Sequence, residues 1–258
     1  MILAAAVGDV VGSIYERRPT KRTDFALIDP RARFTDDTVL TMATAEAILS
    51  GGDYADMYRR FARRYPNAGY GGNFRGWFVS EAAGPYNSFG NGSAMRVSPV
   101  GWAFDTTEEV LTQAERSAGC THDHPEGIKG AQATALALFR ARGGTGPEDI
   151  AREIAERFGY DLSRSIEDIR PGYSFDVTCQ GSVPESLIAF LEGRSVEATV
   201  RLAVSLGGDS DTQACIGASV AQAHDPRIPP ELESHVRERL PADLLDTNDR
   251  FCDRFRRP

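Results

Sequence analysis

The sequence predicts an all-α protein, and three observations support that class. Apolar residues recur at three- and four-residue spacing along most of the chain, and alanine-rich faces suit close packing between helices. The alternation of apolar and polar residues that marks a strand occurs only in the short segment 173–177. No linker, repeat or low-complexity tract interrupts the pattern, so we expect residues 1–258 to form a single domain with a substantial buried core.

Helices are predicted wherever the apolar spacing persists. In the first helical segment, Gly8 and Gly12 lie four residues apart on one face, which lets another backbone approach closely. Glu16 follows at the end of that segment, where a solvated glutamate is the ordinary interpretation. The remaining predicted helices cover 38–50, 53–65, 108–119, 126–142, 147–158, 184–192, 195–206 and 212–223.

Signals at helix starts and between helices support these boundaries. Threonine caps precede acidic residues at 106–109, and Pro147 stands ahead of acidic residues at a later start. Glycine-rich stretches separate the helices, and loops of this kind commonly carry the chemistry of a rigid helical scaffold. These stretches are 67–76, 84–93 and 207–208.

Two acidic clusters stand at predicted loop-to-helix junctions far apart in the chain. The first is TDDT at 35–38, and the second is DSDT at 209–212, after two glycines. Either cluster alone is typical of a helix cap, since Thr, Asp and Ser are favoured there. A cap requires only one such side chain, so the repeated Asp/Asp/Thr set favours a shared metal site. Mg²⁺ and Mn²⁺ suit it because hard cations prefer carboxylate and hydroxyl oxygens.

Composition and charge narrow the classes of function. Lys and Arg number 29 against 37 Asp and Glu, a net charge of -8, so there is no strong nucleic-acid-binding signature. Four dispersed cysteines without a CxxC pair favour a reduced, cytoplasmic protein. The apolar start lacks the cationic leader of a signal peptide, and no apolar run approaches the roughly 20 residues of a membrane span, so no membrane association is expected.

Two further segments have a composition suited to ligands. The segment SFGNGSAMR at 88–96 combines an aromatic residue with small residues and amides that could cradle a phosphate and stack a base. A flexible loop is the simpler interpretation of that segment alone. Cys120, His122 and His124 suggest zinc, but their spacing matches none of the common zinc sites.

Five motifs occur in order along the chain: GDVVGSIYE, RFTDDT, FGNGSAMRVSPVG, THDHPEGIKGAQA and SLGGDSDTQACIGA. Together they resemble the ADP-ribosylglycohydrolase family, the group that includes dinitrogenase reductase-activating glycohydrolase, over about residues 4–223. The resemblance implies a compact, orthogonal multi-helix domain with two Mg²⁺ or Mn²⁺ ions at the bottom of a cleft. It also implies hydrolysis of the bond between the anomeric carbon of ADP-ribose and a modified protein side chain, nucleic acid or small molecule.

The resemblance also assigns candidate residues by position. The implied metal ligands are Thr35, Asp36, Asp37, Asp209, Asp211 and Thr212. The implied catalytic candidates are Glu16, Asp36, Asp37 and Asp209. The implied substrate-binding residues are Ser88, Phe89, Gly90, Asn91 and His122. Among them, Glu16 matches a mobile glutamate that reaches the metals in some relatives, and Phe89 is expected to stack on adenine.

Two other functions remain open at this point. A two-metal phosphoesterase could use the same carboxylates, but such enzymes usually carry several histidine ligands, and this chain has four histidines in all. A non-catalytic ADP-ribose-binding or structural relative would have lost metal ligands that this chain retains. The expected partner is an ADP-ribosylated substrate or ADP-ribose. We expect a monomer in which segments 65–74 and 173–178 line the mouth of the cleft.

Overall fold

Helices form the framework of this computed structural model, which describes residues 1–256, and the predicted all-α class is confirmed. In the first half of the chain they are α1 (Leu3–Gly12), α2 (Asp36–Ser50), α3 (Tyr54–Arg64), α4 (Gly72–Val79), α5 (Gly92–Met95), α6 (Ser98–Ala103), α7 (Thr107–Gly119) and α8 (Pro125–Arg142). The second half adds α9 (Pro147–Phe158), α10 (Ile166–Ile169), α11 (Cys179–Gly193), α12 (Val196–Ser205), α13 (Ser210–His224), α14 (Pro230–Arg237) and α15 (Ala242–Phe255). No helix in this described range is long and apolar enough to cross a membrane.

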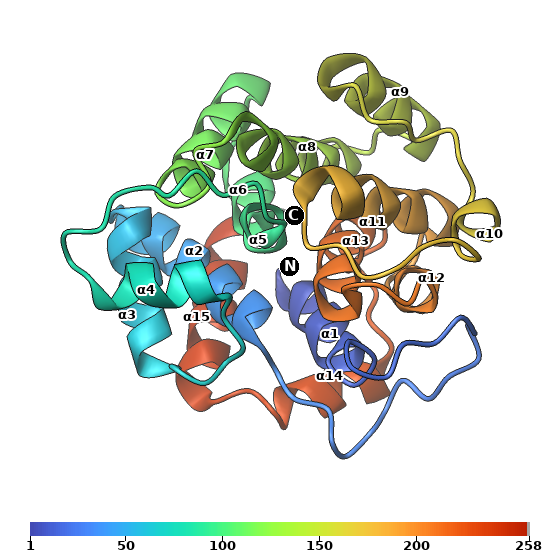
Figure 1. Ribbon diagram of the computed structural model, residues 1–258, viewed down its shortest axis with the longest axis horizontal. Helices are drawn as coiled ribbons and strands as arrows, with labels where there is room; N and C mark the ends of the chain where they lie inside the picture. The colour runs from blue at the N-terminus through green and yellow to red at the C-terminus, as the bar shows by residue number, and fades with distance from the viewer. Residues whose placement is uncertain (257–258) are drawn as a thin grey trace.

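The buried helix α1 packs against α13, so helices from opposite halves of the chain meet in the core. In Figure 1, α1 lies between α2 to α4 on the left and α11 to α13 on the right. All ten residues of α1 are buried, as expected for a helix that is almost entirely apolar. A Cβ built on Gly8 would lie 2.3 Å from the Ala214 carbonyl oxygen. The expectation that glycines on this face admit another backbone is therefore confirmed.

The predicted helix boundaries agree closely with the observed ones, with two exceptions. The first helical segment, expected to end at Glu16, ends at Gly12. The helix predicted over 184–192 begins at Cys179 instead. Its N-cap is Thr178, whose hydroxyl accepts the backbone N–H of Gly181 at 3.1 Å. Pro184 favours a first turn when the sequence is considered alone, but here it lies inside α11.

The strand predicted over 173–177 is wrong. The structure of residues 1–256 contains no strand, and an isolated antiparallel bridge joins Gly90 to Thr178 instead. Beside this bridge, the backbone N–H of Asn91 donates to the Val177 carbonyl at 2.8 Å. The alternating pattern therefore belongs to an extended loop that pairs only briefly with the loop before α5. This pairing ties the two loops together.

Besides α4, α5, α6 and α10, of which α4 and α5 begin inside predicted glycine-rich loops, the predicted helices omit the two C-terminal helices, α14 and α15. Each buries only a narrow stripe against the rest of the molecule, and polar residues interrupt that stripe. In α14 the buried residues are Leu232, His235 and Val236. In α15 they are Leu244, Thr247, Asn248 and Phe251. Because three of these seven positions are polar, the apolar period is too weak to predict the helices.

Candidate metal centre and cleft

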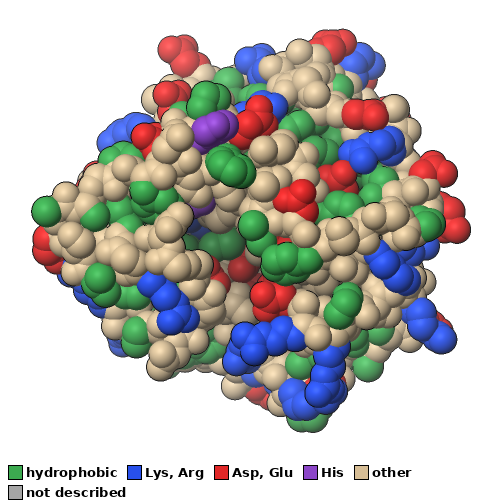
Figure 2. Space-filling view, viewed as in Figure 1, with side chains coloured by type: hydrophobic (Ala, Val, Ile, Leu, Met, Phe, Trp, Pro, Cys, Tyr) green, Lys and Arg blue, Asp and Glu red, His purple; other side chains and the backbone are tan. Residues whose placement is uncertain are grey.

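A cavity of about 520 Å³ contains both acidic clusters in its wall. Figure 2 shows acidic side chains inside a hollow near the middle of one face of the molecule. The wall also includes Gly69 and Phe74 from one predicted mouth segment, and Phe175 and Val177 from the other. The expectation that segments 65–74 and 173–178 contribute to the cleft is therefore confirmed.

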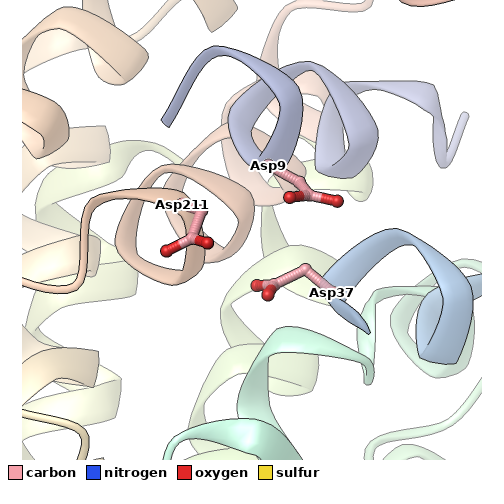
Figure 3. Close-up of side chains that lie close together, drawn as sticks. All are labelled: Asp9, Asp37 and Asp211. Carbon is pink, nitrogen blue, oxygen red and sulfur yellow. The ribbon is translucent and has the colours of Figure 1, made fainter. Parts of the chain in front are cut away.

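Three helices bring aspartates together beside this cavity. Asp9 lies in α1, Asp37 in the first turn of α2 and Asp211 in the first turn of α13. Figure 3 shows the three carboxylates pointing toward one another, and one oxygen of each lies within 4.8 Å of the others. Glu16, Asp209 and Asp211 form a second such group. Because both groups include Asp211, they form one continuous acidic centre.

Asp9 is the member of this centre that the sequence-derived candidates missed. Its buried carboxylate accepts the hydroxyl of Thr35 at 2.7 Å and the Thr35 backbone N–H at 2.8 Å. It also accepts the backbone N–H of Thr38 at 3.0 Å and the Thr38 hydroxyl. The sequence signal that could have identified Asp9 is a lone aspartate within an otherwise apolar helix. A carboxylate buried in such a helix requires hydrogen-bond or ionic partners, so it indicates a polar site.

Helix capping explains only part of the two clusters. Thr35 is the N-cap of α2, and its hydroxyl accepts the backbone N–H of Asp37 at 3.4 Å. Asp209 is the N-cap of α13 but makes no side-chain capping bond. Its Oδ2 instead accepts the side-chain amide of Asn91 at 2.7 Å. The hydroxyl of Thr212 donates to Asp37 at 3.4 Å and so joins the second cluster to the first.

Burial and mutual repulsion raise the pKa values of the carboxylates in this centre. Burial and the charge of Asp9 raise the pKa of Asp36 to about 7. For Asp37 and Asp211, burial followed by the charges of neighbouring carboxylates raises the pKa well above its usual value. In the apo state the centre therefore favours bound protons. Cations would compete with those protons for the same oxygens.

The donor set fits divalent cations. Asp37 Oδ1 is buried and has no hydrogen-bond partner among residues 1–256, an arrangement that costs energy unless another group satisfies the oxygen. Both groups consist of carboxylates, with the hydroxyls of Thr35 and Thr212 beside them, and hard cations prefer such oxygens. Within the same range, neither group includes a cysteine or histidine, so nothing supports the zinc alternative.

Four of the five predicted substrate-binding residues line the cavity: Ser88, Gly90, Asn91 and His122. Phe89 lies beside them but is absent from the wall. The residue is 44% exposed, and its ring centroid lies 5.2 Å from that of His124. Phe175 is 55% exposed and does line the cavity. The tertiary structure thus adds a second aromatic residue that could contact a base.

The sequence was compared with protein-family models and with known proteins, and the matches agree with the features of this site. The family model described as ADP-ribosylglycohydrolase matches residues 1–258. The chain is similar to ADP-ribosylhydrolase ARH3 from Mus musculus, at 26% identity over 86% of this chain and 82% of that protein. It is also similar to ADP-ribosylhydrolase ARH3 from Homo sapiens, at 26% identity over 86% of this chain and 84% of that protein.

A solved structure shares the fold. It is a chain of an ADP-ribosylglycohydrolase-related protein complex, with a TM-score of 0.70 and 27% sequence identity. The similarity covers 91% of this chain and 93% of that chain. The match to the family model extends over the acidic clusters and the rest of the cavity wall. The chain belongs to the ADP-ribosylglycohydrolase family.

Proposed function

We propose that this protein is a metal-dependent ADP-ribosylhydrolase, in which residues 1–258 act as one domain. The reaction would cleave the bond between the anomeric carbon of ADP-ribose and a modified group. Family membership supports the reaction class, and the pair of overlapping carboxylate groups beside the cavity is the observation that carries the proposal. The cavity volume of about 520 Å³ is within the range of roughly 300–1,000 Å³ common for small-molecule sites.

The acidic centre would hold two Mg²⁺ or Mn²⁺ ions. The proposed ligands are Thr35, Asp36, Asp37, Asp209, Asp211 and Thr212. When bound, such cations neutralise the carboxylates and act as Lewis acids toward the ribose hydroxyls and water. Asp9 would hold this ligand set in position, because its oxygens already accept hydrogen bonds from Thr35 and Thr38.

Glu16 is our first candidate for general base. It lies in the turn after α1, is partly buried and lines the cavity next to Asp209 and Asp211. A carboxylate there could accept a proton from the attacking water while positive charge develops on the sugar ring. Asp36, Asp37 and Asp209 remain alternative bases because each also lines the cavity.

Asn91 would fix the spacing between the substrate-binding loop and the acidic centre. Its side-chain amide donates to Ser182 at 3.1 Å and to Asp209 at 2.7 Å. Its backbone N–H is held by the Val177 carbonyl at 2.8 Å. A ligand whose diphosphate contacts the loop at 88–91 could therefore place its distal ribose at the carboxylates.

The product of the reaction tests this proposal against its alternatives. The purified protein should be incubated with ADP-ribosylated arginine and serine peptides, ADP-ribosylated nucleic acid and O-acetyl-ADP-ribose, each with Mg²⁺, Mn²⁺ or EDTA. A hydrolase of the proposed type releases intact ADP-ribose from at least one substrate, and EDTA stops the release. A phosphoesterase would instead split the diphosphate into AMP and ribose 5-phosphate. A non-catalytic relative would bind ADP-ribose without releasing any product.

A further inference from the structure

A series of hydrogen bonds connects Arg96 to His122, and both residues line the cavity. The Arg96 side chain is fully buried, and its Nη2 donates to the Thr121 hydroxyl at 2.8 Å and to the Ser117 carbonyl at 3.0 Å. Thr121 Oγ1 lies 2.7 Å from His122 Nδ1. Arg96 immediately follows α5, while Thr121 and His122 follow α7. The contact therefore joins two parts of the wall.

The surrounding groups determine which partner donates and which accepts in each of these hydrogen bonds. A guanidinium can only donate, so the Thr121 oxygen accepts from Arg96. The Thr121 hydroxyl proton then has two acceptors within reach: His122 Nδ1 at 2.7 Å and the Ala118 carbonyl at 3.5 Å. That carbonyl already accepts the backbone N–H groups of Thr121 at 3.0 Å and His122 at 2.8 Å. The hydroxyl therefore donates to Nδ1, which must carry a lone pair.

We propose that Thr121, fixed by Arg96, holds His122 as a neutral imidazole with its proton on Nε2. Arg96 and Thr121 are then positioning residues, and His122 presents a hydrogen-bond donor. Burial and the charge of Arg96 lower the pKa of His122 well below its usual value, which disfavours the imidazolium form. The same cationic neighbour that orients Thr121 thus also keeps His122 neutral.

The Nε2 atom of His122 faces the cavity. A Cβ built on Gly92 would lie 3.3 Å from this nitrogen, and one built on Gly90 would lie 3.6 Å from it. Both glycines line the cavity, as does His122 itself. Within residues 1–256, the hydrogen bond that the His122 ring makes is the one at Nδ1, to Thr121. The Nε2 N–H is therefore available to an oxygen of the ligand, which is an oxygen of ADP-ribose if the proposed function is correct.

Nitrogen-15 NMR of the histidine side chains in the ligand-free protein tests the tautomer directly. The His122 signals are identified by their loss in His122→Asn. In the wild type, we expect the proton on Nε2 and a bare Nδ1. Thr121→Ser keeps the hydroxyl and should preserve this state. Thr121→Val keeps the branched shape but lacks the hydroxyl, so the proton should distribute between the two nitrogens.

Calorimetric titration with ADP-ribose in the presence of Mg²⁺ provides the second readout. Thr121→Val should weaken binding about tenfold, the scale of one hydrogen bond to a charged ligand, and Thr121→Ser should restore it. A proton on Nδ1 in the wild type overturns the inference, as does a valine variant with unchanged tautomer and affinity. Because the NMR arm requires no ligand, failure of the wild type to bind ADP-ribose would count against the proposed function alone.

Discussion

Gly12 in α1 lies against the backbone of Asp211 in α13. A Cβ built on Gly12 would lie 2.4 Å from the Asp211 Cα and 2.5 Å from the Ser210 carbonyl oxygen. No side-chain rotation can relieve such contacts because they involve backbone atoms. The same interface carries Asp9 from α1 and the second acidic cluster from α13, so helix packing and the geometry of the acidic centre depend on each other.

Gly12→Ala should therefore impair both stability and cation binding. Overpacking typically costs about 1–3 kcal/mol, and we expect a loss of at least that size in the free energy of unfolding. Thermal unfolding with and without Mn²⁺ measures both effects. Gly76→Ala is the control: Gly76 is exposed within α4, and a Cβ there would meet no atom within 4 Å. Equal behaviour of the two variants would show that the α1–α13 contact can relax without consequence.

Asp37→Ala and Asp211→Ala should each abolish turnover and remove most of the stabilisation by cations. A cation present at about 100 times its dissociation constant stabilises the native state by about 2.7 kcal/mol, and each variant should lose most of that gain. Melting curves across a Mn²⁺ titration measure it. Glu115→Ala, an exposed substitution in α7, should behave as the wild type. Full activity of the wild-type protein in EDTA would contradict the metal assignment.

The raised pKa of Asp36, about 7 against a usual value of 3.8, predicts how the apo protein responds to pH. A carboxyl that binds its proton more tightly in the folded state stabilises the fold at low pH, and this stabilisation is lost as pH rises through about 7. In EDTA, the ionisation of Asp36 should therefore lower the melting temperature as pH increases from about 5 to 8. Asp36→Asn should flatten that dependence.

Added cations should reverse this trend, because they bind the ionised carboxylates and displace protons. The increase in melting temperature produced by Mn²⁺ should therefore be larger at pH 8 than at pH 5.5. The burial and mutual repulsion that raise the pKa values of Asp37 and Asp211 act in the same direction. An equal increase at both pH values would argue that these carboxylates do not bind the cation.

Glu16→Gln should separate catalysis from binding. A general base typically contributes roughly 10²- to 10⁴-fold, so turnover should fall by about that factor while ADP-ribose still binds. Single-turnover assays and calorimetric titration measure the two effects independently. A parallel Mn²⁺ titration checks whether Glu16 is a ligand instead, since it groups with Asp209 and Asp211. Near wild-type turnover would leave Glu16 as an ordinary residue beyond the helix end.

Two aromatic residues at the cleft, Phe89 and Phe175, are candidates to stack on the adenine of ADP-ribose. Stacking on a base is worth about 1–3 kcal/mol by alanine substitution, so Phe89→Ala should weaken ADP-ribose binding roughly 5- to 150-fold. Ribose 5-phosphate lacks adenine and should bind this variant and the wild type equally. Phe175→Ala is the matched comparison, because Phe175 lies in the cavity wall and Phe89 beside it. An effect confined to Phe175→Ala would transfer the stacking role to that residue.

Local sequence information determined the helical class and most helix boundaries. The apolar period, the caps and the glycine pair in α1 act over a few residues, so each is visible in a short window. The two acidic clusters were also recognisable because their carboxylates exceed what capping requires. The apolar spacing did not predict α14 and α15, because buried polar residues such as Asn248 interrupt the apolar stripe there.

Only the tertiary structure decided how these parts combine. Asp9 joins the centre through hydrogen bonds to Thr35, 26 positions away, and Thr212 reaches Asp37 across 175 positions. Such distances depend on how α1, α2 and α13 pack, and local spacing carries no information about them. Which ring nitrogen of His122 carries the proton likewise depends on Arg96, which a separate loop brings to Thr121. The sequence determined which groups are available, and packing determined which of them meet, because electrostatic and hydrogen-bond energies depend on distance in space.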